Sequence, residues 1–291
     1  MNSKYLERIN QVYPELYIED YDRIDIGQNN DVFIINKSFI FRFPKYEKGI
    51  ENLKKEMEIL ESINNSLSVP IPNPIYQSFE YMEVGIAFAG YKLIQGTPLW
   101  RENFVNIENP KMIKGLATQL TTFLLELHSI SDERLKKFLK QGENAPHKQM
   151  SELFLKIQNK LFPFVREEAK KEISRSFGNF LNNETTSILK TTLIHGDFGA
   201  SNILWEPVGC KISGIIDFGA SGVGDPAYDF AGLLSSYGEN FYNMCINLYP
   251  NGNEISERVK FYKSTFALQE ALHGIENNDI KAFENGIKDY K

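Results

Sequence analysis

The sequence predicts an α+β protein with a small, strand-rich N-terminal part and a larger, mainly helical C-terminal part. Two patterns support this prediction. Before about residue 95, runs of β-branched and aromatic residues dominate, with a single helical pattern among them. After Pro98, apolar residues recur at helical spacing over most of the chain. Because 291 residues can form two domains, we expect one domain over residues 1–95 and a second over residues 96–291.

The N-terminal part contains one predicted hairpin, one predicted helix and a further strand. Residues 31–35 and 38–43 are β-rich runs on either side of the two-residue turn 36–37, which is the pattern of a β-hairpin. Residues 49–64 are charged, with apolar side chains at helical spacing, so they predict a helix. Residues 91–94 predict a strand that precedes Gly96 and the start of the second domain.

The C-terminal part is predicted to alternate between helices and a short block of strands. An apolar stripe of leucine and phenylalanine residues predicts a long helix that ends near His128. Residues 149–189 predict a second helical region, interrupted at Pro163. Residues 192–216 return to short strands, and helices resume from Tyr228 to the end of the chain.

Composition narrows the class of protein. The net charge of −6 argues against a nucleic-acid-binding protein, which would usually carry a basic surface. The cysteines, Cys210 and Cys245, lie far apart and outside any metal-binding spacing, so we expect free thiols in a reducing compartment. The N-terminus lacks the apolar core of a signal peptide, and no run of about 18 apolar residues occurs, as a membrane-spanning helix would need. We therefore expect a cytoplasmic protein that binds neither nucleic acid nor membrane.

Three residues carry the pattern of phosphoryl-transfer chemistry. Asp197 follows a short buried strand, Asn202 lies five residues later, and Asp217 lies fifteen residues after Asn202. A carboxylate in the position of Asp197 can orient an attacking hydroxyl group. An amide oxygen and a second carboxylate are ligands that Mg²⁺ accepts. Residues 203–205 and 213–216 predict paired strands that return Asp217 to the side of Asn202. The structural alternative for each aspartate alone is a turn residue that caps backbone groups.

These segments resemble the aminoglycoside phosphotransferase family, a branch of the protein-kinase-like fold, and most closely its 2″-phosphotransferases. The stretch His195–Asn202 matches the family's catalytic loop, and Ile216–Gly219 matches its metal-binding motif. The segment 224–230 matches a helix start in which Asp225 and Asp229 support the catalytic loop. The resemblance implies a two-lobed kinase-like fold, Asp197 as the catalytic residue, and Asn202 and Asp217 as ligands of Mg²⁺.

The resemblance extends into the N-terminal part, where it implies a nucleotide site. Arg42 stands where the family usually has a phosphate-binding lysine, and Glu56 is the helix carboxylate that would hold it. From the residues alone, Glu56 could equally belong to a solvated helix face. Gly27 lies in the loop that would cover the nucleotide. The remaining cofactor-binding candidates form the hinge that would meet the purine of ATP or GTP: Tyr91, Lys92 and Ile94.

Other classes of protein fit the sequence less well. A protein kinase would need a long activation segment, but residues 220–224 alone separate the metal motif from Asp225. Gly196 also replaces the arginine that pairs with an activation-loop phosphate in protein kinases. A non-enzymatic, nucleotide-binding pseudokinase would usually have lost one of the three phosphoryl-transfer residues, and all three are present. We therefore expect a kinase that phosphorylates a hydroxyl group of a small molecule.

The substrate is expected to be an antibiotic. The 2″-phosphotransferases bind a polycation with carboxylates from helices after the metal motif, which here implies Glu239 and Glu270 as substrate-binding residues. Tyr237, on the same stretch of chain, is a further substrate-binding candidate through its aromatic ring. This acidic set is small. A macrolide phosphotransferase, which would bind through aromatic walls, and a choline-like metabolite kinase remain alternatives. The aromatic candidates have ordinary helix packing as their structural alternative: Phe230, Tyr237, Phe241 and Phe266. We expect a monomeric resistance enzyme that uses ATP or GTP with Mg²⁺.

Overall fold

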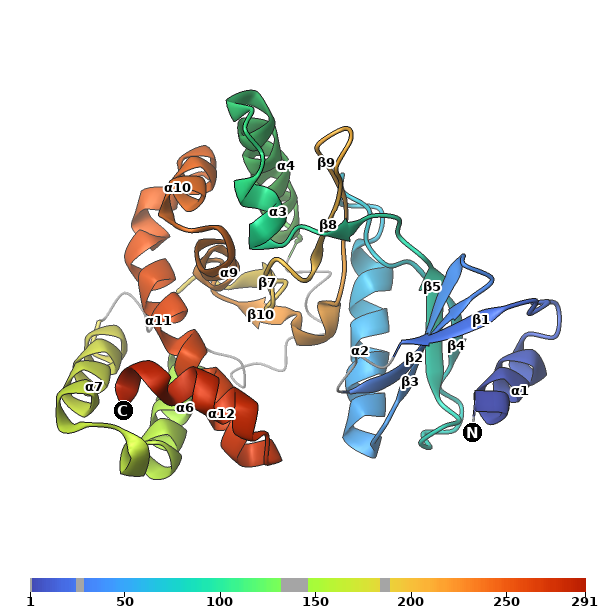
Figure 1. The fold of residues 1–291 in the computed structure, drawn as a ribbon, viewed down its shortest axis with the longest axis horizontal. Coiled ribbons are helices and arrows are strands. Elements are labelled where there is room, and N and C mark those ends of the chain that lie inside the picture. The colour runs from blue at the N-terminus through green and yellow to red at the C-terminus, as the bar shows by residue number, and fades with distance from the viewer. Residues whose placement is uncertain (1, 25–28, 132–145, 184–188) are drawn as a thin grey trace. The chain divides into compact units, whose positions relative to one another are not determined.

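The computed structural model describes residues 2–24, 29–131, 146–183 and 189–291 (Figure 1). The chain forms two compact units. The first unit comprises Met1–Leu99 and Ser201–Ser221, and the second comprises Trp100–Ala200 and Gly222–Lys291. The segment Ser201–Ser221 therefore packs with the first unit, although it follows the expected boundary at residue 95 by more than a hundred positions. The assignment of nucleotide binding to one domain and catalysis to the other stays a prediction.

The first unit is built on a five-stranded antiparallel sheet in the order β1-β2-β3-β5-β4. The predicted hairpin is confirmed, because β2 and β3 pair and their turn residues, Asn36 and Lys37, have φ of 51° and 52°. Two successive positive φ angles are the mark of a tight hairpin turn whose twist matches that of the strands. The strands of the sheet are β1 (Tyr21–Ile24), β2 (Asn30–Ile35), β3 (Phe39–Pro44), β4 (Pro74–Ser78) and β5 (Phe88–Lys92).

Strand β5 differs in extent from the predicted strand 91–94. It starts at Phe88 and ends at Lys92. The sequence signal is weak there because alanine and glycine have low β-propensity. Packing supplies the reason for the glycine: a Cβ atom on Gly90 would lie 2.8 Å from the ring of Phe41 on the neighbouring strand. The close approach of these two strands thus requires glycine at this position.

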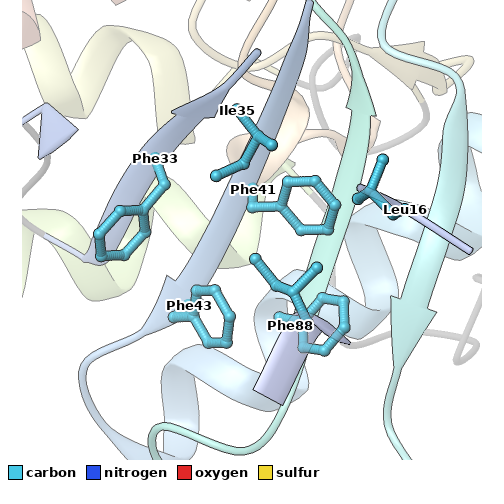
Figure 2. Packing of buried hydrophobic residues seen from close by; sticks show 7 residues of the cluster. Leu16, Phe33, Ile35, Phe41, Phe43 and Phe88 are labelled. Carbon is cyan, nitrogen blue, oxygen red and sulfur yellow. The ribbon is translucent and has the colours of Figure 1, made fainter. Parts of the chain in front are cut away.

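The two faces of this sheet are covered by different helices (Figure 1). Helix α1 (Asn2–Val12), which the sequence pattern does not predict, lies over the face that carries a cluster of phenylalanine rings. Figure 2 shows this cluster, in which rings from β2, β3 and β5 gather with Leu16 and Ile35. Helix α2 (Glu47–Ile63), which confirms the predicted helix 49–64, packs against β3, β4 and β5. Residues that alternate along β3 therefore face either the aromatic cluster or α2.

A small three-stranded antiparallel sheet completes the first unit. Its strand order is β6-β8-β9, and its strands are β6 (Thr97–Pro98), β8 (Ile203–Glu206) and β9 (Lys211–Ile215). Ile203 pairs with Ile215, and the N–H of Ile216 donates to the carbonyl of Asn202 at 2.9 Å. The predicted pairing that returns Asp217 to Asn202 is thus confirmed. A short 3₁₀ turn, Phe218–Ala220, follows Asp217.

The second unit is mainly helical, as predicted, with one two-stranded sheet. The helical region expected over 149–189 is divided by a 3₁₀ turn, Phe162–Phe164, that contains Pro163, and its second helix ends at Leu181. The helices are α3 (Arg101–Val105), α4 (Pro110–His128), α6 (Pro146–Lys160), α7 (Glu167–Leu181), α9 (Ala227–Tyr237), α10 (Glu239–Leu248), α11 (Gly252–Asn277) and α12 (Ile280–Ile287). The strands β7 (Thr192–Ile194) and β10 (Gly222–Gly224) pair in antiparallel fashion.

Two predictions from composition bear on the described residues. Cys210 and Cys245 are both free and buried, as expected. Burial raises the pKa of the Cys245 thiol to about 12. Among the described helices, none is both long enough and apolar enough to cross a bilayer.

A buried ion pair joins the start of α9 to α11. The Asp225 carboxylate is buried and accepts two hydrogen bonds from Arg258, at 2.6 Å from Nε and 3.0 Å from Nη2. It also accepts a hydrogen bond from the Tyr262 hydroxyl at 3.2 Å and from the Ala227 N–H at 3.1 Å. Asp225 therefore anchors the first turn of α9 to a helix more than thirty residues further along the chain.

This pair leads to a prediction about stability. Arg258→Ala leaves the Asp225 charge buried without its cation, and breaking a buried pair in this way costs about 3 kcal/mol or more. We expect a lower urea midpoint for Arg258→Ala than for the double variant Asp225→Asn/Arg258→Met, which removes the stranded charge. Urea unfolding followed by circular dichroism measures both, together with the single variants Asp225→Asn and Arg258→Met. A double variant whose loss equals the sum of the losses of these two single variants would contradict the pairing.

Candidate active site

Arg42 is placed in the first unit by the alternation of strand β3. Its neighbours Phe41 and Phe43 point into the aromatic cluster, so Arg42 points to the opposite face, toward α2. There its Nη1 donates to Oε1 of Glu56 at 2.6 Å. Glu56 is only 2% exposed and Arg42 12%, so the two form a buried ion pair. Glu56 is therefore not part of a solvated helix face.

Asp217 lies beside this ion pair. The Nη2 atom of Arg42 is 3.8 Å from Oδ1 of Asp217, whose side chain is 56% exposed. Burial opposes the charge on Arg42, but Glu56, Tyr91 and Asp217 outweigh it and raise the pKa of the guanidinium. The cation therefore lies between one buried and one exposed carboxylate, and the exposed carboxylate of Asp217 is open to solvent.

The backbone at Asp217 is unusual. Its φ of 62° and ψ of 71° place it in the left-handed region, where few residues other than glycine are found. A Cβ atom on Gly219 would lie 3.3 Å from Oδ1 of Asp217 and 3.5 Å from Oε2 of Glu56. Non-glycine residues in this region cluster at ligand-binding and catalytic sites. The strain and the close-packed turn both point to Asp217 as a functional residue.

Asn202 and Asp217 have the chemistry of a magnesium site. Asn202 is buried and directly precedes β8. Its carbonyl accepts the hydrogen bond from Ile216, the residue before Asp217. An amide oxygen and a carboxylate are hard oxygen donors, as Mg²⁺ requires. Among the described residues, no cluster of three or more His, Cys, Asp or Glu side chains could hold a metal ion. The pair of oxygen donors from Asn202 and Asp217 fits a cation such as Mg²⁺, which keeps water and phosphate oxygens as its other ligands.

The predicted purine-binding residues lie at the end of β5 in the same unit. Tyr91 is buried, and burial raises the pKa of its hydroxyl although Arg42 opposes that shift. Lys92 is exposed at the end of the strand. Ile94 packs against Gly214, where a Cβ atom would lie 2.5 Å from Cγ2 of Ile94. Gly27 lies outside the described residues.

In the second unit, Asp197 is part of a loop that follows β7. Residues 195–200 belong to the segment that resembles the family's catalytic loop, and we use the name catalytic loop for these six residues below. Asp197 is exposed, and its N–H donates to Nδ1 of His195 at 3.2 Å. Gly196 has φ of 79°, a conformation that glycine adopts without strain. The two N–H groups of His195 and Gly196 donate to the Asp229 carboxylate at 2.8 and 2.9 Å.

A buried side-chain network holds Asp229 in turn. Nε2 of His128 is 3.1 Å from Oδ2 of Asp229, and Nδ1 of His128 is 3.0 Å from the Tyr249 hydroxyl. A carboxylate only accepts, so Nε2 of His128 carries the hydrogen, and in a neutral ring Nδ1 accepts from Tyr249. In the sequence, the one signal for this network is that His128 lies at the end of the predicted apolar helix, and nothing indicates Tyr249 as its partner.

The position of Tyr249 predicts a pH dependence. Burial, followed by the charges of Asp229 and Asp225, raises the pKa of Tyr249 from 10.0 to about 12. The folded protein holds this proton more tightly than the unfolded chain does. Its stabilising contribution is therefore complete below pH 10 and is lost as the pH rises to about 12.

We expect Tyr249→Phe to lower the melting temperature at pH 8, because Nδ1 of His128 loses its hydrogen-bond partner. Between pH 10 and about 12, where the wild type loses the contribution of this group, the variant should lose less stability. Thermal unfolding at a series of pH values measures both effects. An identical fall of the melting temperature in the two proteins would contradict this prediction.

The predicted substrate-binding residues have different environments. Tyr237 is 6% exposed, and its ring packs against Phe104 and Phe241 with centroids 4.9 and 5.3 Å away. Glu239, at the start of α10, and Glu270, on α11, are both exposed. Phe230 and Phe241 are buried and Phe266 packs on Tyr228, so ordinary core packing accounts for these aromatic residues.

Comparison with known proteins identifies the family and the fold. The model of a phosphotransferase enzyme family, APH, matches residues 20–262. Viomycin phosphotransferase from Streptomyces vinaceus is 30% identical over 269 residues, which cover 91% of each chain. The structure of APH(2″)-IIIa with GDP and kanamycin has a TM-score of 0.87 at 24% identity and covers 98% of this chain and 96% of that one. The complex of APH(2″)-IIa with streptomycin and ATP has a TM-score of 0.77 at 23% identity and covers 100% and 96%.

The predicted two-lobed, kinase-like fold is thus confirmed. The family match covers both the strand-rich first part of the chain and the segments that carry Asp197, Asn202 and Asp217. The protein belongs to the phosphotransferase enzyme family, and it is a kinase that acts on hydroxyl groups.

Proposed function

We propose that this kinase transfers the γ-phosphate of ATP or GTP to a hydroxyl group of an aminoglycoside-type antibiotic and so confers resistance. The observation that carries the proposal is the buried Arg42–Glu56 pair with the exposed Asp217 carboxylate at its side. This arrangement offers a fixed cation for phosphate oxygens and a carboxylate for a metal ion within a few ångströms. Similarity to viomycin phosphotransferase supports a cationic antibiotic as the acceptor, and similarity to structures solved with kanamycin and with gentamicin supports an aminoglycoside.

The donor nucleotide would be held by the first unit. Arg42 would bind the phosphates with its fork of N–H donors, which suits phosphate geometry. Asn202 and Asp217 would hold Mg²⁺, which neutralises charge on the phosphate oxygens when bound. Gly27 would belong to the loop over the nucleotide, and the purine would meet the chain at the hinge residues Tyr91, Lys92 and Ile94. Similar proteins have been solved with GDP and with ATP, so both nucleotides are donor candidates.

The acceptor would be oriented by the second unit. Asp197 would accept a hydrogen bond from the attacking hydroxyl and align it in line with the γ-phosphate. The oxygen of that hydroxyl forms the new bond to phosphorus, the bond to the β-phosphate oxygen breaks, and the hydroxyl proton is released toward Asp197. Transfer is direct, with no phosphoenzyme. Glu239 and Glu270 would attract the amino groups of the antibiotic, and Tyr237 would support the helix that leads to Glu239.

A panel assay tests this function. The purified protein is incubated with Mg²⁺, with ATP or GTP, and with kanamycin, gentamicin, streptomycin, viomycin, a macrolide or choline, and the product is identified by mass spectrometry. We expect one added phosphate on at least one of the three aminoglycosides. Phosphorylation of viomycin, the macrolide or choline alone would overturn the aminoglycoside as the acceptor class. A folded, nucleotide-binding protein that phosphorylates none of the six would overturn the proposed function as a whole.

A cell-based measurement completes the test. Expression of the protein in a susceptible bacterium should raise the minimal inhibitory concentration of the phosphorylated antibiotic. We further propose that the protein acts as a cytoplasmic monomer, which size-exclusion chromatography coupled to light scattering and cell fractionation would check. If expression of the Asp197→Asn variant raised the minimal inhibitory concentration as much as expression of the wild type does, the resistance would not come from catalysis.

A further inference from the structure

One face of helix α9 contacts the catalytic loop at three points. Asp229 binds the backbone N–H groups of His195 and Gly196. One turn later, Gly232 lies directly beneath the carbonyl of Phe198, and two turns from Asp229 the Ser236 hydroxyl accepts a hydrogen bond from the Ala200 N–H at 3.0 Å. The spacings of three and four residues place all three residues on the same face of a helix.

Gly232 marks the closest approach of helix and loop. A Cβ atom at this position would lie 2.4 Å from the carbonyl oxygen and 2.9 Å from the carbonyl carbon of Phe198. Glycine destabilises the interior of a helix relative to alanine, so helix formation does not favour it here. Because the atoms in the way belong to backbone rather than to a flexible side chain, any larger residue would push the loop away from α9.

The side chain of Phe198 fixes the middle of the loop by a separate contact. Its ring is almost completely buried and stacks on Phe123, with centroids 5.5 Å apart and an angle of 4° between the planes. The loop is thus fixed at residues 195–196, at residue 198 and at residue 200. Asp197 lies between the first two fixed points, so small shifts of the loop against α9 move its carboxylate.

We propose that Gly232 and Ser236 are positioning residues for phosphoryl transfer, acting through the backbone of the catalytic loop. The proposal rests on the proposed role of Asp197 in orienting the acceptor hydroxyl. When an orienting group is displaced by a fraction of an ångström, the rate of the chemical step falls more than the affinity for substrate does. Ser236 and Gly232 therefore affect kcat, while the nucleotide-binding residues of the first unit are unchanged.

The neighbouring serine provides a matched control. Ser235 is exposed, precedes Ser236 on the same helix, and presents its side chain to a different face. Ser236→Ala and Ser235→Ala change the same atoms and the same helix propensity, so they differ only in the contact with Ala200. We expect Ser236→Ala to lower kcat by about two- to tenfold, the range for one hydrogen bond, with the KM for nucleotide within about twofold of wild type. Ser235→Ala should match wild type.

Two further readouts separate positioning from general stability. Hydrogen exchange of the Ala200 amide should be faster in Ser236→Ala than in wild type or Ser235→Ala, while the melting temperature stays within about 3 °C. Gly232→Ala should lower kcat further than Ser236→Ala. If Gly232→Ala fails to fold, the Ser236 and Ser235 pair still tests the proposal.

The outcomes distinguish this proposal from the proposed function. If wild type phosphorylates an antibiotic and Ser236→Ala has the kcat of Ser235→Ala, the positioning role is overturned and the proposed function stands. A loss of kcat in Ser236→Ala that is matched by an equal rise in KM and a large drop in melting temperature also overturns it. Wild-type protein with no turnover overturns the proposed function, and the positioning role with it.

Discussion

Asp197→Asn is expected to lower kcat by about 10³-fold, because the amide can no longer accept the proton and orient the attacking hydroxyl in the same way. Nucleotide binding should be unchanged, since Arg42, Glu56 and Asp217 belong to the other unit of the chain. Steady-state kinetics with the accepted antibiotic and isothermal titration calorimetry with the nucleotide measure the two quantities separately.

Asp289→Asn is a suitable control for this prediction. Asp289 is an exposed aspartate of the second unit, and the same chemical change at that position should leave kcat and nucleotide affinity at wild-type values. If Asp197→Asn retains more than about a tenth of wild-type kcat, Asp197 is not the residue that orients the acceptor.

Arg42→Ala is expected to have the second large effect, on both stability and nucleotide affinity. The change leaves the Glu56 carboxylate, which is 2% exposed, without its cation, and breaking a buried pair costs about 3–5 kcal/mol. It also removes the cation proposed to bind the nucleotide phosphates. Denaturant unfolding and nucleotide titration measure the two losses, and Arg42→Lys should be intermediate because a lysine cannot contact both Glu56 and Asp217 with a fork of donors.

An exposed ion pair on α2, the helix that carries Glu56, provides the control. Lys48 and Glu51 are also 2.6 Å apart, but their side chains are 72% and 62% exposed. An exposed pair contributes about 0–1 kcal/mol, so Lys48→Ala should leave stability nearly unchanged. Equal losses for Arg42→Ala and Lys48→Ala would show that burial does not determine the contribution of the Arg42 pair.

Local patterns allowed much of the fold to be predicted. The hairpin around Asn36 and Lys37, helix α2 and the return of Asp217 to Asn202 all depend on contacts between residues that are close in sequence. Helix α1 was not predicted because it is short and its apolar face is stabilised by the distant phenylalanine rings of the sheet. Strand β10, with the sequence Gly-Val-Gly, has almost no strand propensity and forms by pairing with β7.

The site could be predicted in part for a similar reason. Arg42 and Glu56 lie on adjacent elements, so a strand and the helix that follows it bring them together within fourteen residues. His128 and Tyr249 are 121 residues apart, and nothing in either local sequence indicates a partner. Tyr237 is expected at the substrate, its ring packs among other rings, and its role in binding stays a prediction. An aromatic residue on a helix has the same pattern whether it faces a ligand or the core.

By itself, the sequence determined the reaction class of this protein. The order and spacing of Asp197, Asn202 and Asp217 are local properties of a loop and a hairpin, and together they predict phosphoryl transfer. The tertiary structure alone decided how these residues are held: Arg42 between two carboxylates, Ser201–Ser221 packed with the first unit, and the catalytic loop fixed on α9. The physical reason is that such contacts join distant segments, and their stability comes from burial and packing that no short stretch of sequence contains.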